Sequence, residues 1–303
     1  MAIAAVGQIC STASRRTNLD QCLKLVEKAA KGGAKILFLP EASDYIASDA
    51  KESLALAEPQ QTSPFVKGLQ KAAAEHSLGV HVGIHHVDDG GSGDASDSRM
   101  LNRALYITPA GDISEASSYD KLHVFDYGSL RESATVRPGT RITPPFDSPV
   151  GRIGSLICFD LRFPEVSLAL TQPGPDSPWA SRPAQILTYP SAFTLRTGDA
   201  HWETLLRARA VESQSWVVAA AQVGKHNLKR ASWGRSIVVD PWGRVVLRLG
   251  GVRDAAGNAE EGAEGAIGFV EINLSEWETV RKEMPLQRRR DVYTGCSAIT
   301  RDQ

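Results

Sequence analysis

The sequence has almost no net charge and no long apolar run. Its 34 Lys and Arg residues are balanced by 35 Asp and Glu residues, so it lacks the basic field that would hold nucleic acid. The arginine run at 288–290 is short and typical of a solvated or salt-bridged surface. No apolar run approaches the roughly 20 residues that a membrane helix needs. We therefore expect no nucleic-acid partner and no membrane span.

Paired cysteines, linkers and targeting segments are also missing. The four cysteines, Cys10, Cys22, Cys158 and Cys296, form no CxxC pair, which argues against a zinc site or a redox motif. The first residues resemble a strand rather than a signal or transit peptide, so we expect reduced thiols in the cytoplasm. A mitochondrial pool stays open as an alternative. Without a Pro/Ser-rich linker, residues 1–303 are expected to form a single domain.

Runs typical of strands and helices alternate along the chain, which predicts an α/β protein with helices on the face of a sheet. Apolar runs predict strands at 3–9, 36–39, 79–87, 103–108, 152–157, 186–189, 216–221, 234–239, 244–249 and 266–272. Helical spacing predicts a first helix capped by Thr17 or Asn18, and later helices at 64–76, 164–170 and 201–213. Loops are predicted at 88–98, 171–183 and 250–265.

Cys158 lies between the predicted strand at 152–157 and a helix that begins near Pro164. Proline suits the first helical position, because its missing N–H would be unpaired there anyway. A thiol at this junction is expected to be exposed and close to backbone N–H groups that favour negative charge. These are properties of a nucleophile, although a buried structural thiol is the commoner role of a lone cysteine.

A cysteine hydrolase also needs a base and a group that stabilises the oxyanion. None of the seven histidines stands out as that base, and His81 and His85 on one strand face are predicted to be ordinary packing or surface residues. Glu41 ends the strand at 36–39, where partial desolvation would raise its pKa toward the range of a base. A nearby Lys121 would favour thiolate and oxyanion. Taken alone, both residues fit ordinary surface charges equally well.

Three segments, FLPEASDY, YDKLHVFD and GSLICFDLRFPE, resemble the motifs of the nitrilase superfamily of carbon–nitrogen hydrolases. They occur in the family's order, and the likeness extends over nearly the whole chain. The resemblance implies that Glu41 is the general base, Lys121 the oxyanion stabiliser and Cys158 the nucleophile. Glu132 matches the family's second glutamate, which orients the lysine and the substrate. The backbone N–H of Phe159 would complete the oxyanion hole.

The resemblance also implies a four-layer α-β-β-α sandwich that forms a homodimer through helices beside the active site. It implies a small-molecule amide as substrate, with no metal and no organic cofactor. The segment CFDLRFP is typical of the amidase branches, since true nitrilases tend to carry Cys-Trp-Glu at this place. The segments 192–210 and 217–234 are similar to those of deaminated glutathione amidases, which act in metabolite repair.

Two alternatives remain at this point. One is an omega-amidase that acts on 2-oxoglutaramate or another small amide, and the other is a non-catalytic scaffold, although Glu41, Lys121 and Cys158 are all present. The chain departs from the branch at 171–183, which is longer than usual, and at Arg235, which replaces the usual His of Gly-His-Ser.

Deaminated glutathione has two distant carboxylates, so its site needs cations or N–H donors around the thiol. Arg162, Phe193 and Thr194 are expected to contact the substrate, although Arg162 is equally suited to pair with Glu165. Further cations in the segments that flank the triad are Arg196, Arg207, Arg209 and Lys225.

Overall fold

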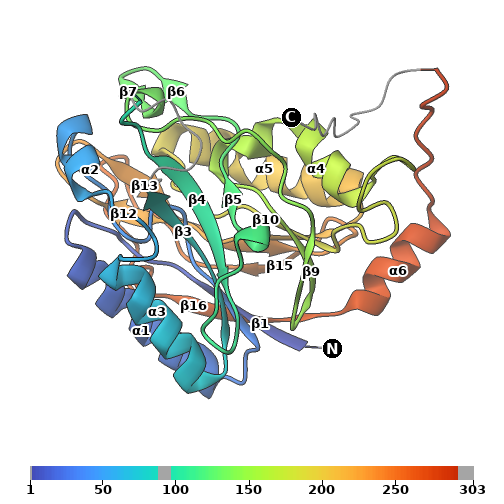
Figure 1. Cartoon of the computed structure of the whole chain (residues 1–303), viewed down its shortest axis with the longest axis horizontal. Coiled ribbons are helices and arrows are strands. Elements are labelled where there is room, and N and C mark those ends of the chain that lie inside the picture. The colour runs from blue at the N-terminus through green and yellow to red at the C-terminus, as the bar shows by residue number, and fades with distance from the viewer. Residues whose placement is uncertain (1, 88–96, 293–303) are drawn as a thin grey trace.

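A computed structural model describes residues 2–87 and 97–292, which contain two six-stranded sheets (Figure 1). The first sheet has the order β16-β1-β2-β3-β4-β5, with the bounds Ile267–Ile272, Ala2–Gly7, Ile36–Phe38, Gly79–His86, Leu101–Ile107 and Tyr119–Asp120. The second has the order β15-β14-β11-β10-β9-β8, with the bounds Val245–Arg248, Ile237–Val239, Trp216–Ala219, Ile186–Thr188, Gly151–Ser155 and Phe146–Ser148. Each sheet has parallel strands at its centre, β1-β2-β3 in one and β9-β10-β11 in the other.

Helices cover the outer face of each sheet. α1 (Arg15–Lys31) and α3 (Pro64–His76) pack against each other and against the first sheet, as Figure 1 shows. α4 (Pro164–Thr171) and α5 (Leu195–Ser213) pack against the second sheet. The parallel strands follow one another through these helices, because a parallel pair needs a long crossover connection.

Successive side chains along the central strands point alternately into two apolar cores. Ala5 and Leu37 face the core under α1 and α3, whereas Val6 and Phe38 face a core between the two sheets. That middle core also takes Ile153, Ile186 and Val218 from the second sheet. Both faces of each central strand are buried, as expected for parallel strands covered on both sides. The predicted four-layer α-β-β-α sandwich is confirmed.

α1 begins earlier than predicted. Its cap is Ser14, whose hydroxyl accepts a hydrogen bond from the backbone N–H of Thr17 at 3.3 Å, so the helix starts at Arg15. Asn18 is buried instead, and its side-chain amide donates to the carbonyl of Asp44 at 2.9 Å. The polar residue that suggested a cap therefore fastens the helix to the segment after β2.

α5 also begins earlier, at Leu195 rather than at the predicted His201. The predicted loops are more ordered than their composition suggested. Trp179 in the segment 171–183 is buried, and its indole N–H donates to the carbonyl of Ala169 at 2.8 Å. Val252 in the segment 250–265 is likewise buried. Most of the predicted loop at 88–98 lies outside the described residues.

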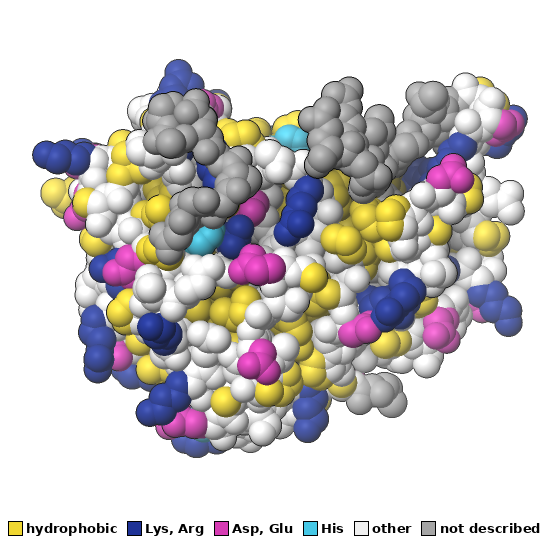
Figure 2. Space-filling model, in the orientation of Figure 1, with side chains coloured by type: hydrophobic (Ala, Val, Ile, Leu, Met, Phe, Trp, Pro, Cys, Tyr) yellow, Lys and Arg dark blue, Asp and Glu magenta, His cyan; other side chains and the backbone are white. Residues whose placement is uncertain are grey.

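Four further elements lie outside the two large sheets and the helices that cover them. They are the helix α2 (Ala50–Leu56), the hairpin β6 (Asp126–Tyr127) with β7 (Leu130–Arg131), the hairpin β12 (Val223–Lys225) with β13 (Ala231–Trp233), and the helix α6 (Leu274–Glu283). Sequence patterns predicted none of them. Across residues 2–87 and 97–292, no helix is long and apolar enough to cross a membrane. Figure 2 shows cations interspersed with anions on one face of the molecule.

Candidate active site

Three strand ends bring the predicted catalytic side chains together. Glu41 follows β2, Lys121 follows β5, and Cys158 begins a 3-10 turn (Cys158–Arg162) after β9. The Nζ of Lys121 donates to Oε1 of Glu41 at 2.9 Å, and the thiol of Cys158 is hydrogen-bonded to the Glu41 carboxylate. The first sheet therefore supplies the carboxylate and the ammonium, and the second sheet supplies the thiol.

The backbone turns sharply at two points in this cluster. Cys158 has a φ of 46°, and Ala42, which follows Glu41, has a φ of 53°. Residues other than glycine rarely adopt this left-handed backbone conformation. The backbone strain that it causes persists only where the surrounding structure fixes it. The N–H of Cys158 donates to the carbonyl of Pro190 at 3.1 Å. Gly83 packs on the other turn, where an added Cβ would lie 2.6 Å from the Cα of Glu41.

Glu41 is held by donors on both carboxylate oxygens. Its Oε1 accepts from the side-chain amide of Asn102 at 2.7 Å, and its Oε2 accepts from the backbone N–H of Ala192 at 2.9 Å. Burial pushes the pKa of Glu41 upward, but the charge of Lys121 and the hydrogen bonds from Lys121, Cys158 and Asn102 hold the pKa below its usual 4.5. The expectation of a raised pKa was wrong, and Glu41 is an anion at neutral pH.

Lys121 lies between two carboxylates. Its Nζ is 2.9 Å from an oxygen of Glu41 and 2.9 Å from an oxygen of Glu132. Burial alone would lower the pKa of the ammonium, but Glu132 and Glu41 raise it well above 10.5. Glu132 in turn accepts from the amide of Asn102 at 2.9 Å and from the backbone N–H of Phe125 at 2.5 Å. The described geometry thus places Glu132 where it can orient the lysine.

Cys158 is buried, contrary to the exposed thiol expected from its place between a strand and a helix. Only 7% of its surface is exposed. Burial and the Glu41 carboxylate raise the pKa of the thiol above its usual 9.0, and the charge of Lys121 opposes them only in part. The resting group is therefore a neutral thiol beside an anionic carboxylate, which can take the proton as the sulfur attacks.

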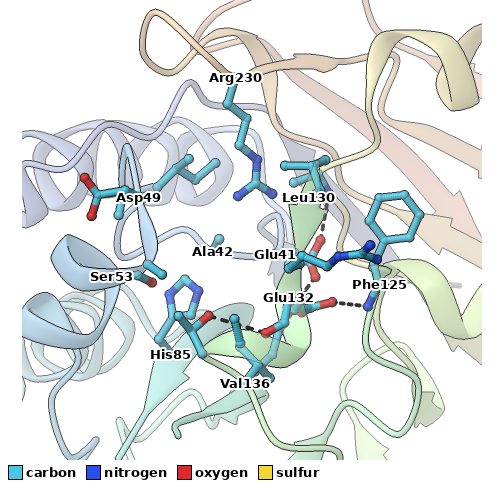
Figure 3. Close-up of a pocket in the computed structure, with 18 of the residues that line it drawn as sticks. Glu41, Ala42, Asp49, Ser53, His85, Phe125, Leu130, Glu132, Val136 and Arg230 are labelled. Atoms are coloured by element: carbon cyan, nitrogen blue, oxygen red, sulfur yellow. Dashed lines mark hydrogen bonds between the residues drawn. The ribbon is translucent and has the colours of Figure 1, made fainter. Parts of the chain in front are cut away.

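The cluster forms the floor of a cavity of about 460 Å³, within the range of small-molecule sites (Figure 3). One wall comes from the segment after β2 and the start of α2, and another from the β6–β7 hairpin. The charged rim residues are the cations Arg131, Lys229 and Arg230 and the anion Asp49. Such a rim suits a substrate with negatively charged groups.

The three predicted substrate contacts, Arg162, Phe193 and Thr194, do not line this cavity, and neither does the side chain of Phe159. The ring of Phe159 packs edge-on against Phe125, with ring centres 5.0 Å apart, although its backbone N–H still adjoins Cys158. Arg162 lies over the Phe159 ring and bonds to Nδ1 of His201 at 3.0 Å rather than to Glu165.

Phe193 and Thr194 have structural roles. The Phe193 ring is buried against Trp202, with ring centres 4.7 Å apart. Thr194 caps α5, because its hydroxyl accepts from the backbone N–H of Thr197 at 3.3 Å. Two of the flanking cations are engaged elsewhere. Arg209 is buried and donates to the carbonyl of Leu161 at 2.6 Å, and Arg207 donates to the carbonyl of Gly243 at 3.0 Å.

Sequence reasoning missed most of the cavity wall, and three of the missed residues are Asn102, His85 and Arg230. Asn102 lies in β4, just before the predicted start of that strand, and a buried Asn in an apolar strand was the available signal. The Nδ1 of His85 lies 3.0 Å from Asp44, and its ring stacks on Tyr45 with ring centres 4.3 Å apart. Arg230 lies in the turn between two short strands that were not predicted.

A thiol, a carboxylate that can accept its proton and an ammonium in one cavity are the groups that acyl transfer through a thioester requires. In the described part of the chain, no group of three or more His, Cys, Asp or Glu side chains could hold a metal ion. The site thus carries the groups that a hydrolase with a cysteine nucleophile uses.

Comparison with known proteins defines the family. A sequence model of the carbon–nitrogen hydrolases matches residues 3–282, so the chain belongs to this family, the nitrilase superfamily. A probable hydrolase of Schizosaccharomyces pombe is 41% identical over 97% of this chain and 99% of its own length. The deaminated glutathione amidase of Bos taurus is 40% identical over 96% of this chain and 83% of its own length.

Solved structures agree with this assignment. The NitFhit protein of Caenorhabditis elegans superposes with a TM-score of 0.81 at 38% identity, and the match covers 97% of this chain and 66% of that one. A Saccharomyces cerevisiae member of branch 10 of the nitrilase superfamily superposes with a TM-score of 0.75 at 26% identity, covering 95% and 97% of the two chains. The resemblance found in the three sequence motifs is therefore confirmed at the level of family and fold.

Proposed function

We propose that this protein is an amidase that hydrolyses deaminated glutathione to 2-oxoglutarate and Cys-Gly. The observation that carries the proposal is the cluster of Glu41, Lys121, Glu132 and Cys158 at the floor of a cavity with a cationic rim. Deaminated glutathione is anionic at both ends, so a thiol surrounded by rim cations suits it. Relatives about 40% identical that bear the name deaminated glutathione amidase support this substrate.

The proposed mechanism begins at the neutral thiol of Cys158. The sulfur attacks the amide carbonyl while Glu41 takes the thiol proton, and Glu41 then passes that proton to the departing amine. Lys121 and the backbone N–H of Phe159 stabilise the oxyanion, and Glu132 orients Lys121. Water, activated by Glu41, finally hydrolyses the thioester and restores the thiol. The role of each residue is a proposal that rests on these contacts and on the family motifs.

The substrate assignment is tested against the omega-amidase alternative on one protein preparation. We expect equal amounts of Cys-Gly and 2-oxoglutarate from deaminated glutathione, and a higher kcat/KM for it than for 2-oxoglutaramate. The reverse preference would assign the site to an omega-amidase. No release from either amide would favour the non-catalytic scaffold.

We also propose that the chain is a single domain that forms a homodimer and acts in metabolite repair in the cytoplasm. The shared core between the two sheets supports one domain. Exposed apolar residues support the dimer: Val211 on α5 is 46% exposed, and Trp242, in the turn before β15, is 57% exposed. An added Cβ at Gly243 would lie 2.5 Å from Val211, so this turn packs on α5. Sedimentation of the Trp242→Glu variant tests the interface, with a shift to monomer expected.

A further inference from the structure

Arg230 is a rim cation whose side chain reaches into the cavity. Figure 3 shows its side chain extending from the turn between β12 and β13 toward the cavity. Several other half-buried or buried arginines have carboxylate partners, such as Arg103 with Asp120 at 2.6 Å and Arg235 with Glu260 at 3.1 Å. Among residues 2–87 and 97–292, Arg230 takes part in no ion pair. A guanidinium that faces a cavity and has no carboxylate partner is suited to bind an anionic ligand.

The turn that carries Arg230 is fixed in place. The side-chain oxygen of Asn227 accepts from the backbone N–H of Arg230 at 3.0 Å, and its side-chain amide donates to the carbonyl of Ala47 at 3.2 Å. Gln222, just before β12, donates to the carbonyl of Glu41 at 3.0 Å. The hairpin is thus bonded to both ends of the segment 41–47, which holds Arg230 on the Glu41 side of the cavity.

Arg131 occupies a different place. It directly precedes Glu132, which binds Lys121, so it stands on the side of the groups assigned to the oxyanion. It also has the carboxylate of Asp126 as an electrostatic neighbour. Arg230 is therefore tied to the segment that carries Glu41, and Arg131 is part of the segment that carries Glu132.

We propose that Arg230 binds the terminal carboxylate of the leaving group, which in deaminated glutathione is the glycine carboxylate. This inference rests on the proposed function. Glu41 must deliver a proton to the departing nitrogen, so the leaving group extends over the Glu41 side, where Arg230 lies. A guanidinium can hold a carboxylate through two parallel N–H···O bonds, which fixes the dipeptide in one direction.

The test compares two substrates that differ only at this carboxylate, deaminated glutathione and the same molecule ending in glycinamide. Wild-type protein should favour the acid by roughly 10- to 100-fold in kcat/KM, the range of a hydrogen bond to a charged group. Arg230→Gln should lose that preference through slower turnover of the acid, while its rate on the glycinamide changes by less than about threefold, which also serves as its folding control. Arg230→Lys should regain part of the preference.

Lys225→Gln is the matched control, because Lys225 is an exposed cation on the same hairpin and does not line the cavity. It should keep the wild-type preference for the acid. A wild-type protein that releases Cys-Gly but treats acid and amide alike overturns this inference and leaves the proposed function standing. Equal losses on both substrates in Arg230→Gln also overturn it. A wild-type protein that hydrolyses neither substrate overturns the proposed function and this inference with it.

Discussion

The floor and the rim of the cavity satisfy their charges in different ways. On the floor, Lys121 lies within 3.0 Å of both Glu41 and Glu132. The side chains of Lys121 and Glu41 are almost closed to solvent, and that of Glu132 is 17% exposed. On the rim, Lys229 is exposed, and Arg230 is half-buried without an ion pair in the described part of the chain. The charges on the floor are paired with one another before any substrate binds, whereas the rim cations can still pair with an anionic substrate. We infer that the floor performs the reaction and the rim selects the amide.

The largest expected effect is on the floor, in Cys158→Ala. The substitution removes only the attacking sulfur from a small buried site, so turnover should fall to background while the thermal unfolding midpoint stays near that of wild type. Cys10→Ala is the control, because Cys10 is buried outside the cavity and should be dispensable for turnover. Residual Cys158→Ala activity within tenfold of wild type, only about 1.4 kcal/mol in barrier, would rule out this nucleophile.

Lys121→Met should lower kcat by roughly 10²- to 10³-fold, the usual loss for one oxyanion donor. It should also destabilise the fold by about 3–5 kcal/mol, because two buried carboxylates lose their shared cation. Chemical denaturation measures the second effect. Adding Glu132→Gln should restore part of the stability without restoring turnover, and near-normal turnover in either variant would contradict the assigned role.

Glu41→Gln keeps the shape of the side chain and removes its basicity. We expect kcat/KM to fall by at least ~10²-fold on every amide, the low end for general acid–base catalysis. The ratio between deaminated glutathione and 2-oxoglutaramate should stay constant, since the rim is untouched. A changed ratio would contradict the claim that the floor performs the reaction and the rim selects the amide. Steady-state kinetics on both amides measures this ratio.

The smallest expected effect concerns the resting thiol. Because burial and Glu41 raise the pKa of Cys158, its thiolate fraction at pH 7 is small and should rise about tenfold per pH unit. Alkylation by iodoacetamide, followed by peptide mapping, should therefore keep accelerating from pH 7 to pH 9 without a plateau. A plateau below pH 8 would indicate a thiolate stabilised by Lys121, as the sequence alone had suggested.

The floor residues could be named from the sequence because three segments resemble the motifs of a known family. Without that resemblance, Glu41 and Lys121 fitted ordinary surface charges equally well. The burial of Cys158 could not be predicted, since it depends on side chains that approach from both sheets. The early start of α5 was missed because Thr194 was assigned to the substrate, whereas its hydroxyl caps the helix.

The rim residues could not be predicted from the sequence for a similar reason. Arg230 lies in a turn between strands of three residues each, too short for a periodic pattern. The position of this turn is set by the hydrogen bond between Asn227 and Ala47, two residues that are far apart in sequence. The expected cations, such as Arg162, were chosen for their closeness to Cys158 along the chain, and closeness in sequence did not place them in the cavity.

The most direct test of the central claim is to map the covalent intermediate. Wild-type protein is mixed with deaminated glutathione, quenched in acid within the first turnover, digested and analysed by mass spectrometry. The account predicts a 2-oxoglutaryl thioester on the peptide that contains Cys158, with Cys-Gly released in matching amount. An adduct on Cys10 or Cys22 instead, or a burst of Cys-Gly with no adduct on any cysteine, would contradict it.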